Sequence, residues 1–223
     1  MPIPSHYTVE QVPSSTLSTN KLIRNTYILL SLTLLCSAGT ATLAVLGRAP
    51  ALPWWGVLIG YFGLLFTTQA LRNSAWGLLA VFALTGFMGY TLGPILTAYL
   101  GLPNGHLIVA MAMAGTGSIF LALSAYALIS RKDFSFMGGF LMVGMLVAFL
   151  ASLAAIFVSM PGLSLAVSAM FVLLMSGFIL WQTSEMINGG EDNYIMATLG
   201  LYVSLYNLFV SLLQILGIWN SDD

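Results

Sequence analysis

The sequence predicts an all-α membrane protein with seven transmembrane helices, and two observations support this fold class. Of the 223 residues, 59% are hydrophobic and only 6% are charged, whereas soluble domains contain roughly 25% charged residues. The hydrophobic residues also form uncharged runs, each close to the ~20 residues that a helix needs to cross the bilayer core. The net charge of −1 excludes a nucleic-acid role that depends on a basic surface.

The expected helices follow one another with short turns between them. Residues 1–24 are expected to form a flexible cytoplasmic tail, because the first twenty contain three prolines and a polar run without a hydrophobic period. The transmembrane domain is expected at 25–219, followed by a short exterior tail at 220–223. Its spans are expected at about 27–46, 52–71, 76–100, 107–129, 134–160, 163–185 and 194–217.

Local residues mark the ends of several spans. The first run is about twice as long as the apolar part of a signal peptide, so we expect a retained helix. Trp54 and Trp55 open the second span at the depth where aromatic residues meet the membrane interface. The basic turn at 131–133 separates the fourth and fifth spans, a Pro-Gly pair at 161–162 separates the fifth and sixth, and a Gly-Gly pair at 189–190 ends the sixth.

A proline lies inside the third span. Pro94, which follows Gly93, has no N–H to donate, so one carbonyl of the preceding turn loses its partner and the helix should kink. Two interpretations of this kink stay open: a bend that serves packing, and a hinge that serves gating.

The basic residues predict the orientation. Lys21, Arg24, Arg72 and the Arg131-Lys132 pair fall at one side of a seven-span chain, and Arg48 falls at the other. Because basic residues are retained in the cytoplasm, we expect a cytoplasmic N-terminus and a periplasmic or exterior C-terminus.

The seventh span carries a polar line on one helix face, although it is apolar enough for lipid. Residues with small or polar side chains recur there at steps of three and four: Ala197, Gly200, Ser204, Asn207, Ser211 and Gln214. Small residues let helix backbones approach, and amide or hydroxyl groups need partners on neighbouring helices. The line therefore predicts that this helix lies in the middle of the bundle. It serves either as a packing seam or as a substrate path.

Ionisable side chains are absent from the middle of the expected spans. This argues against a proton relay through the bilayer, and the lack of a lysine in 194–217 excludes a retinal Schiff base. Ser118 lies in a glycine-rich setting, but the histidines, His6 and His106, are outside the reach of a mid-membrane serine. Metal-ligand spacing is absent too. We therefore expect neither an enzyme nor a protein with a metal or cofactor.

Glu185 is the ionisable residue nearest to mid-depth, about one turn from the end of the sixth span. It has two interpretations. It is either a solvated residue at a helix end, or a latch that reaches toward Arg72 or the polar line and responds to protonation.

Several segments together resemble the Bax inhibitor-1 (transmembrane Bax inhibitor motif) family, and in particular its bacterial members. The clearest are GFMGYTLGPIL at 86–96, RKDFSFMGG at 131–139 and LYVSLYNLF at 201–209, supported by 17–27, 114–116, 124–126 and 188–195. The resemblance covers nearly the whole chain after residue 15.

The resemblance implies a seven-helix fold in which the last helix is wrapped by the other six. It also implies two competing functions. Bacterial members bind and modulate the membrane-bound AAA protease FtsH and are degraded by it, so FtsH and its associated membrane regulators are the expected partners, beside the lipid bilayer. Other members are pH-sensitive calcium or cation leak channels.

The sequence departs from the leak-channel pattern at its acidic pair. Counting from Trp181 and Tyr202, the two aspartates of that pattern correspond to Gln182 and Ser204, and neither side chain titrates. The expected latch or pore residues are therefore Gln182, Glu185, Ser204, Asn207 and Arg72, with a hydrogen-bonded Gln182–Ser204 pair or Glu185 in place of the acidic gate. Calcium is the weaker of the two partner hypotheses for this reason.

Overall fold

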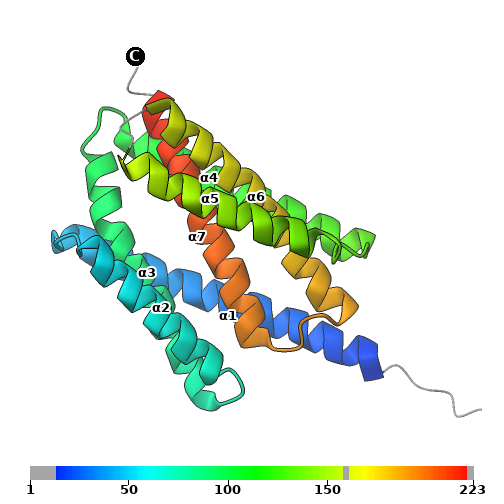
Figure 1. The fold of residues 1–223 in the computed structure, drawn as a ribbon. Coiled ribbons are helices and arrows are strands. Elements are labelled where there is room, and N and C mark those ends of the chain that lie inside the picture. Colours follow the sequence, from blue (N-terminus) through cyan, green and yellow to red (C-terminus); the bar gives the residue numbers. More distant parts are fainter. Residues whose placement is uncertain (1–13, 158–160, 220–223) are drawn as a thin grey trace, which may run out of the picture.

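The computed structural model describes residues 14–157 and 161–219, and these ranges contain seven α-helices and no strand (Figure 1). The helices are α1 (Ser14–Leu46), α2 (Trp54–Ala70), α3 (Ala75–Leu100), α4 (Gly105–Ser130), α5 (Met137–Phe157), α6 (Pro161–Asn188) and α7 (Tyr194–Trp219). The all-α class and the seven helices predicted from the sequence are thereby confirmed.

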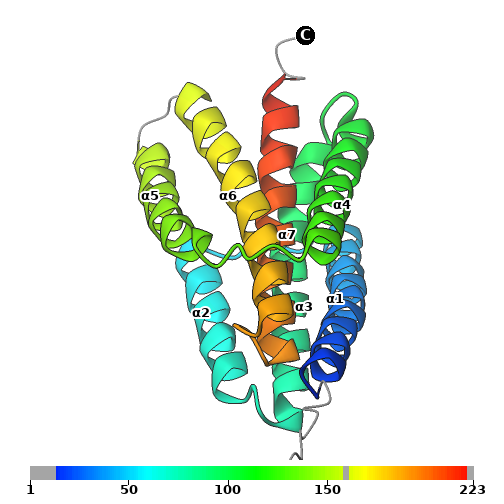
Figure 2. The ribbon, with the colours of Figure 1, turned by 90° about the vertical axis from the view of Figure 1, so that its right-hand side faces the viewer.

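Six of these helices are long and apolar enough to cross a membrane. The exception is α2, which has 17 residues and would measure about 26 Å at 1.5 Å per residue, a little less than the ~30 Å hydrocarbon layer. Pro53 at its N-cap and Leu71 at its C-cap set these limits. The short helix is nevertheless apolar along most of its length and packs against α3, the next helix of the chain; Figure 2 shows the turn that joins the two.

The first helix begins earlier than the sequence indicated. The expected tail covered residues 1–24, but α1 is helical from Ser14 onward, while residues 1–13 lie outside the described part of the chain. Leu22 and Ile23 pack against the main hydrophobic core, whereas Lys21 and Arg24 are exposed. The amphipathic first turns are therefore held by tertiary contacts, which a reading of local hydrophobicity does not detect. The other expected tail, 220–223, also falls outside the described residues.

Helix ends follow from local capping chemistry. The side chain of Ser74 accepts a hydrogen bond from the Trp76 backbone N–H at 3.3 Å at the start of α3. Asn193 does the same for α7, where its Oδ1 accepts from the N–H groups of Ile195 and Met196. Gly189, with φ of 85°, follows α6 in the left-handed conformation that ends many helices.

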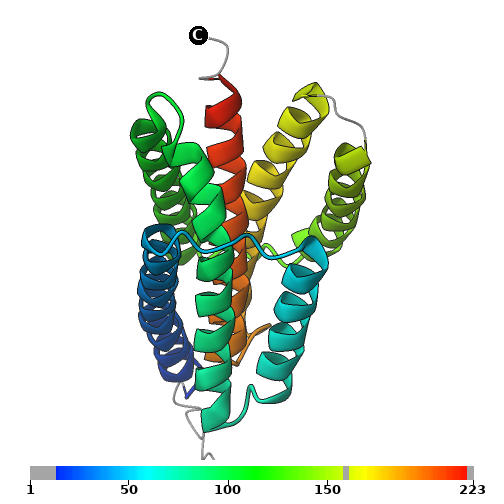
Figure 3. The ribbon, with the colours of Figure 1, turned by 90° about the vertical axis from the view of Figure 1, so that its left-hand side faces the viewer.

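Helix α7 lies in the centre of the bundle. It packs mainly against α1, α3, α4 and α6, and Figures 2 and 3 show these four helices around it, with α2 and α5 in outer positions. The outer two make their main contacts with α3 and α6 respectively. The predicted central position is thus confirmed, although four helices rather than six form the direct layer around α7.

The bundle has a basic end. It holds the start of α1, the α2–α3 turn, the α4–α5 loop and the α6–α7 loop, and its basic residues are Lys21, Arg24, Arg72, Arg131 and Lys132. Figures 2 and 3 show the start of α1, the α2–α3 turn and the α6–α7 loop together, with the end of α7 at the opposite end. We call this region the basic end below.

Candidate functional site

The polar line of α7 faces α6. Gly200 lies so close to α6 that a Cβ atom placed on it would come within 2.6 Å of Oε1 of Gln182. Further along, the Ser168 hydroxyl of α6 donates to Oε1 of Gln214 at 2.8 Å. Ser204 and Ser211 are buried between these two contacts. The line is therefore the α6–α7 seam, as expected for a central helix whose small residues let a neighbour approach.

Gln182 and Ser204 lie on this seam without forming the expected pair. Ser204 donates its hydroxyl proton to the carbonyl of Gly200, 2.9 Å away in its own helix, and Asn207 donates in the same way to Val203 at 2.8 Å. Gln182 is only 8% exposed and lies against Gly200. Among the described residues no hydrogen bond joins Gln182 to Ser204. The polar groups of α7 are thus satisfied mainly along α7 itself.

Glu185 and Arg72 are also kept apart. The Glu185 carboxylate lies against Gly190, where a Cβ atom would collide with it, and its main-chain carbonyl accepts from the N–H groups of Gly190 and Glu191. The carbonyl of Arg72 instead accepts from Nδ2 of Asn193 at 2.9 Å. In the described part of the chain no ion pair connects the two side chains, so the expected latch is not formed in this conformation.

Gly93 and Pro94 lie where α3 meets α1 and a small pocket. A Cβ atom on Gly93 would collide with Cβ of Ala44, so this glycine permits the close approach of α1. Helix α3 continues through Pro94 to Leu100. Pro94 lines a pocket of about 230 Å³ beside Tyr206 of α7 and the start of α2. The structure therefore gives Gly93 a packing role, and the kink stays a prediction.

A buried network that the sequence reasoning missed joins α7 to α1 and α3. Tyr202 is 1% exposed, and its hydroxyl donates to the carbonyl of Thr85 at 3.2 Å. The Ser37 Oγ lies 2.6 Å from the same hydroxyl. Because the tyrosine has one proton to donate, Ser37 is the donor in that second bond. A tyrosine in the middle of an apolar span was the available signal, since a buried tyrosine hydroxyl usually has a partner.

Two polar side chains hold the loops of the basic end. Ser184 of α6 accepts from the Phe134 N–H at 2.9 Å and donates to the carbonyl of Lys132 at 3.2 Å, which fixes the α4–α5 loop. Asn193 donates to Oδ1 of Asn73 and to the Arg72 carbonyl, which fixes the α2–α3 turn to the start of α7. Two loops distant in sequence are thus fastened to the α6–α7 region.

Asp133 supplies a local charge in the α4–α5 loop. Its Oδ1 accepts a hydrogen bond from the Ser135 N–H at 2.8 Å, and this bond lowers the pKa of the carboxyl below its ordinary value. Asp133 is therefore ionised at neutral pH beside Arg131 and Lys132. Among the described residues there is no group of three or more His, Cys, Asp or Glu side chains that could hold a metal ion.

Comparison with known proteins places this architecture in a family. A family model described as inhibitor of apoptosis-promoting Bax1 matches residues 19–221. The chain belongs to the Bax inhibitor-1 family. The match includes all seven helices apart from the first turns of α1, so the resemblance of the short segments extends over the whole bundle.

Relatives in this family are similar along nearly their full length. An uncharacterized protein of Pseudomonas aeruginosa is 56% identical over 202 residues, which is 91% of each chain. The Escherichia coli protein named modulator of FtsH protease YccA is 51% identical over 209 residues, or 94% of this chain and 95% of its own. An uncharacterized membrane protein of Vibrio cholerae is 46% identical over 210 residues, which is 93% of this chain and 94% of its own. The E. coli protein of another strain is named inner membrane protein YccA, with the same identity.

Proposed function

We propose that this Bax inhibitor-1 family protein lies in the bacterial inner membrane, where it binds and modulates a membrane-bound AAA protease of the FtsH type. The observation that carries the proposal is the 51% identity, over 94% of the chain, with the E. coli modulator of FtsH protease. The absence of mid-membrane acids and bases from the expected spans agrees with a protein that acts by contact and is not itself an enzyme.

The basic end is the proposed contact surface, and it faces the cytoplasm in our proposal. Its α4–α5 loop exposes Arg131, Lys132 and Phe136, the last with 78% of its surface. Ser184 holds the backbone of this loop in place. A loop that is held in one conformation loses less entropy on binding than a flexible one. An exposed aromatic residue beside basic residues is a composition that protein interfaces favour.

A matched pair of phenylalanine variants tests the contact surface. Phe136→Ala should reduce co-purification of the FtsH-type protease, and relieve its inhibition, by about tenfold, as expected for an aromatic anchor worth ~1.4 kcal/mol. Phe140→Ala, one turn into α5 and 72% exposed, should behave like the wild type because its side chain faces lipid in this arrangement. Equal effects of the two variants, or none from either, would contradict a contact through the loop.

Degradation of the protein by the protease needs a separate test. A protease that pulls its substrates needs a segment at which to begin, and the sequence predicts a flexible tail at the start of the chain. Deleting 1–13, which leaves the helix intact, should lengthen the half-life in cells while Phe136-dependent binding persists. If turnover is unchanged, degradation does not begin at this end.

No contact among the described residues favours the leak-channel hypothesis. Gln182 and Ser204 do not titrate, and Glu185 lies against Gly190 instead of closing a path. Calcium flux into proteoliposomes between pH 5 and 8, compared with Glu185→Gln, remains the direct measurement. A wild-type flux that depends on pH and falls in this variant would establish a channel beside, or in place of, the protease role.

A further inference from the structure

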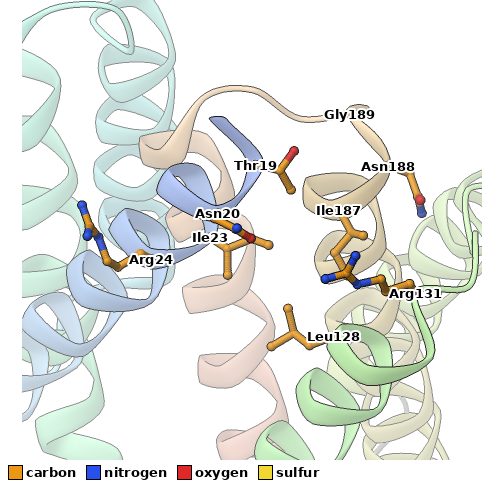
Figure 4. A pocket seen from close by; sticks show the side chains of 9 residues that line it. All are labelled: Thr19, Asn20, Ile23, Arg24, Leu128, Arg131, Ile187, Asn188 and Gly189. Atoms are coloured by element: carbon orange, nitrogen blue, oxygen red, sulfur yellow. The ribbon is translucent and has the colours of Figure 1, made fainter. Parts of the chain in front are cut away.

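A pocket at the basic end is not used by the proposed protease contact at Phe136. It has a volume of about 420 Å³ and lies between the start of α1, the end of α4 and the end of α6 (Figure 4). Helix α1 contributes Thr19, Asn20 and Ile23, α4 contributes Leu128, and the C-cap of α4 contributes Arg131. Three helices that are distant in sequence therefore share one concave surface.

The lining is positively charged at the rim and aliphatic below it. Arg131 extends its guanidinium group into the pocket, whereas Arg24 starts at the rim and points away from it (Figure 4). The lining contains no carboxylate. Asn20 adds an amide, and Ile23 and Leu128 add apolar surface. This combination suits a ligand with an anionic, acceptor-rich head and an apolar portion.

Three buried hydroxyl groups without partners lie on α1 and α4, two of the helices that line the pocket. Among the side chains that the structure describes, Thr26 Oγ1, Tyr27 Oη and Ser124 Oγ are the buried polar atoms that make no hydrogen bond. Tyr27 follows Ile23 by four residues in α1, and Ser124 precedes Leu128 by four in α4, so each lies on the helix face that lines the pocket. Unpaired buried hydroxyls are rare in folded proteins. All three oxygens are enclosed by protein atoms and none of these residues lines the pocket, so they are not ligands in this conformation.

Apolar side chains flank the same region on the outer surface. On α1, Ile28 and Leu32 are 53% and 49% exposed, and on α4, Leu121 and Ile129 are 67% and 83% exposed. Within a bilayer such surfaces are covered by acyl chains. A ligand seated in the pocket thus has apolar protein surface beside it along both helices.

We propose that the pocket binds the phosphate group of an anionic phospholipid, with Arg131 as its principal ligand. Asn20 donates to the phosphate oxygens, and the acyl chains lie on α1 and α4. Basic pockets between transmembrane helices at a membrane surface are recognised sites for acidic lipid head groups. A free phosphate ion shares the head-group chemistry but would leave the aliphatic part of the pocket unused, which favours the lipid.

Lipid binding to the full-length protein in detergent tests this site. Native mass spectrometry would count bound phosphatidylglycerol against phosphatidylcholine with the same acyl chains, and inorganic phosphate would be added as a competitor. We expect the wild type to prefer phosphatidylglycerol, and Arg131→Ala to weaken that binding about tenfold, because a charge-assisted bond to phosphate is lost. Arg131→Lys should retain part of the affinity, since it keeps the charge without the bidentate geometry.

Arg72→Ala is the matched control, because Arg72 belongs to the same end of the bundle but does not line the pocket. It should bind phosphatidylglycerol like the wild type. Equal binding of the two lipids by the wild type, or equal losses in the Arg131 and Arg72 variants, would overturn the proposal. Displacement of the lipid by millimolar phosphate would show a site for a soluble anion instead. Selective binding of an acidic peptide without lipid preference would likewise overturn it.

Gel filtration of each variant separates these outcomes from misfolding, and the comparison of lipids on the wild type needs no variant at all. The pocket does not include Phe136. Loss of protease co-purification in Phe136→Ala with an unchanged preference for phosphatidylglycerol would show that lipid binding does not depend on the protease contact.

Discussion

The hydroxyl group of Tyr202 joins the central helix to two neighbours. It bonds to Ser37 of α1 and to the main chain of α3 at Thr85, at a site with almost no exposure. In an apolar medium a hydroxyl group without a partner is costly, and the Thr85 carbonyl, which lies inside α3, gains a second donor. One phenolic oxygen therefore fixes the rotation of α7 relative to two helices at once.

Removing that oxygen should destabilise the bundle measurably. Tyr202→Phe leaves the Ser37 hydroxyl and the Thr85 carbonyl without this partner, so we expect a loss of about 0.5–1.5 kcal/mol in the free energy of unfolding. Tyr126→Phe is a suitable control, because Tyr126 is 49% exposed. Thermal unfolding in detergent measures both. In a double-mutant cycle with Ser37→Ala, fully additive losses would contradict a shared network.

Residues of this kind show what the sequence can and cannot predict at this scale. The alternation of small and polar residues in 194–217 correctly predicted that this helix is central in the bundle, because periodicity is a local property. The partners of Tyr202 lie 165 and 117 positions away, so no local pattern identifies them. The same limit applies to the Gln182–Ser204 pair, which was expected but is not formed. The sequence places the two residues on facing helices, but it does not show that the Ser204 hydroxyl donates to the Gly200 carbonyl of its own helix.

Between elements, the α1–α3 contact depends on glycine. A Cβ atom on Gly89 would collide with two groups of α1, the main-chain carbonyl of Ser37 and the hydroxyl of Thr40. Gly93, one turn later, meets Ala44 in the same way. Because backbone atoms cannot move aside as a flexible side chain can, the two helices approach closely only while these positions lack side chains.

Gly89→Ala should therefore separate α1 from α3 and destabilise the protein by about 1–3 kcal/mol, as overpacked interfaces do. Gly117→Ala in α4 is the matched control, because a Cβ atom added there would meet nothing within 4 Å. We expect that change to be neutral or to stabilise by up to ~1 kcal/mol through helix propensity. Thermal unfolding in detergent measures the stability of both variants. If Gly89→Ala is as stable as Gly117→Ala, the close contact between α1 and α3 is refuted.

The start of α7 depends on one side chain that performs two tasks. Oδ1 of Asn193 caps the helix, and Nδ2 binds the α2–α3 turn. Asn193→Ala should cost about 1–2 kcal/mol, the usual range for a lost cap combined with lost turn contacts. Asn193→Asp should cost less, because the carboxylate still caps the helix but cannot donate to the turn. Hydrogen exchange at the start of α7 and in 71–74 would separate the two tasks: Asn193→Asp should increase exchange only in the turn.

At the scale of the whole molecule, hydrophobic length and charge predicted the all-α class and the number of helices; the expected end of the fifth span, 158–160, lies outside the described residues. What they did not predict was the unequal placement of helices around α7, with α2 and α5 outside. Every span is apolar, so composition alone does not distinguish a central helix with four neighbouring helices from an outer helix with a single main neighbour. The early start of α1 was missed for a related reason: burial of Leu22 and Ile23 is a property of the assembled bundle.

The orientation of the assembled bundle can be tested directly. The basic end carries five of the six basic residues, and Arg48 lies at the other end, so the basic end should remain in the cytoplasm. Single cysteines are introduced in a Cys36→Ser background at Asp192, in the exposed α6–α7 loop, and at Leu102, which is 42% exposed in the α3–α4 loop. In intact cells stripped of their outer membrane, a membrane-impermeant maleimide should label Leu102→Cys and spare Asp192→Cys. Labelling of Asp192→Cys alone would invert the topology, and it would move the Phe136 surface to the side of the membrane that a cytoplasmic ATP-driven protease cannot reach.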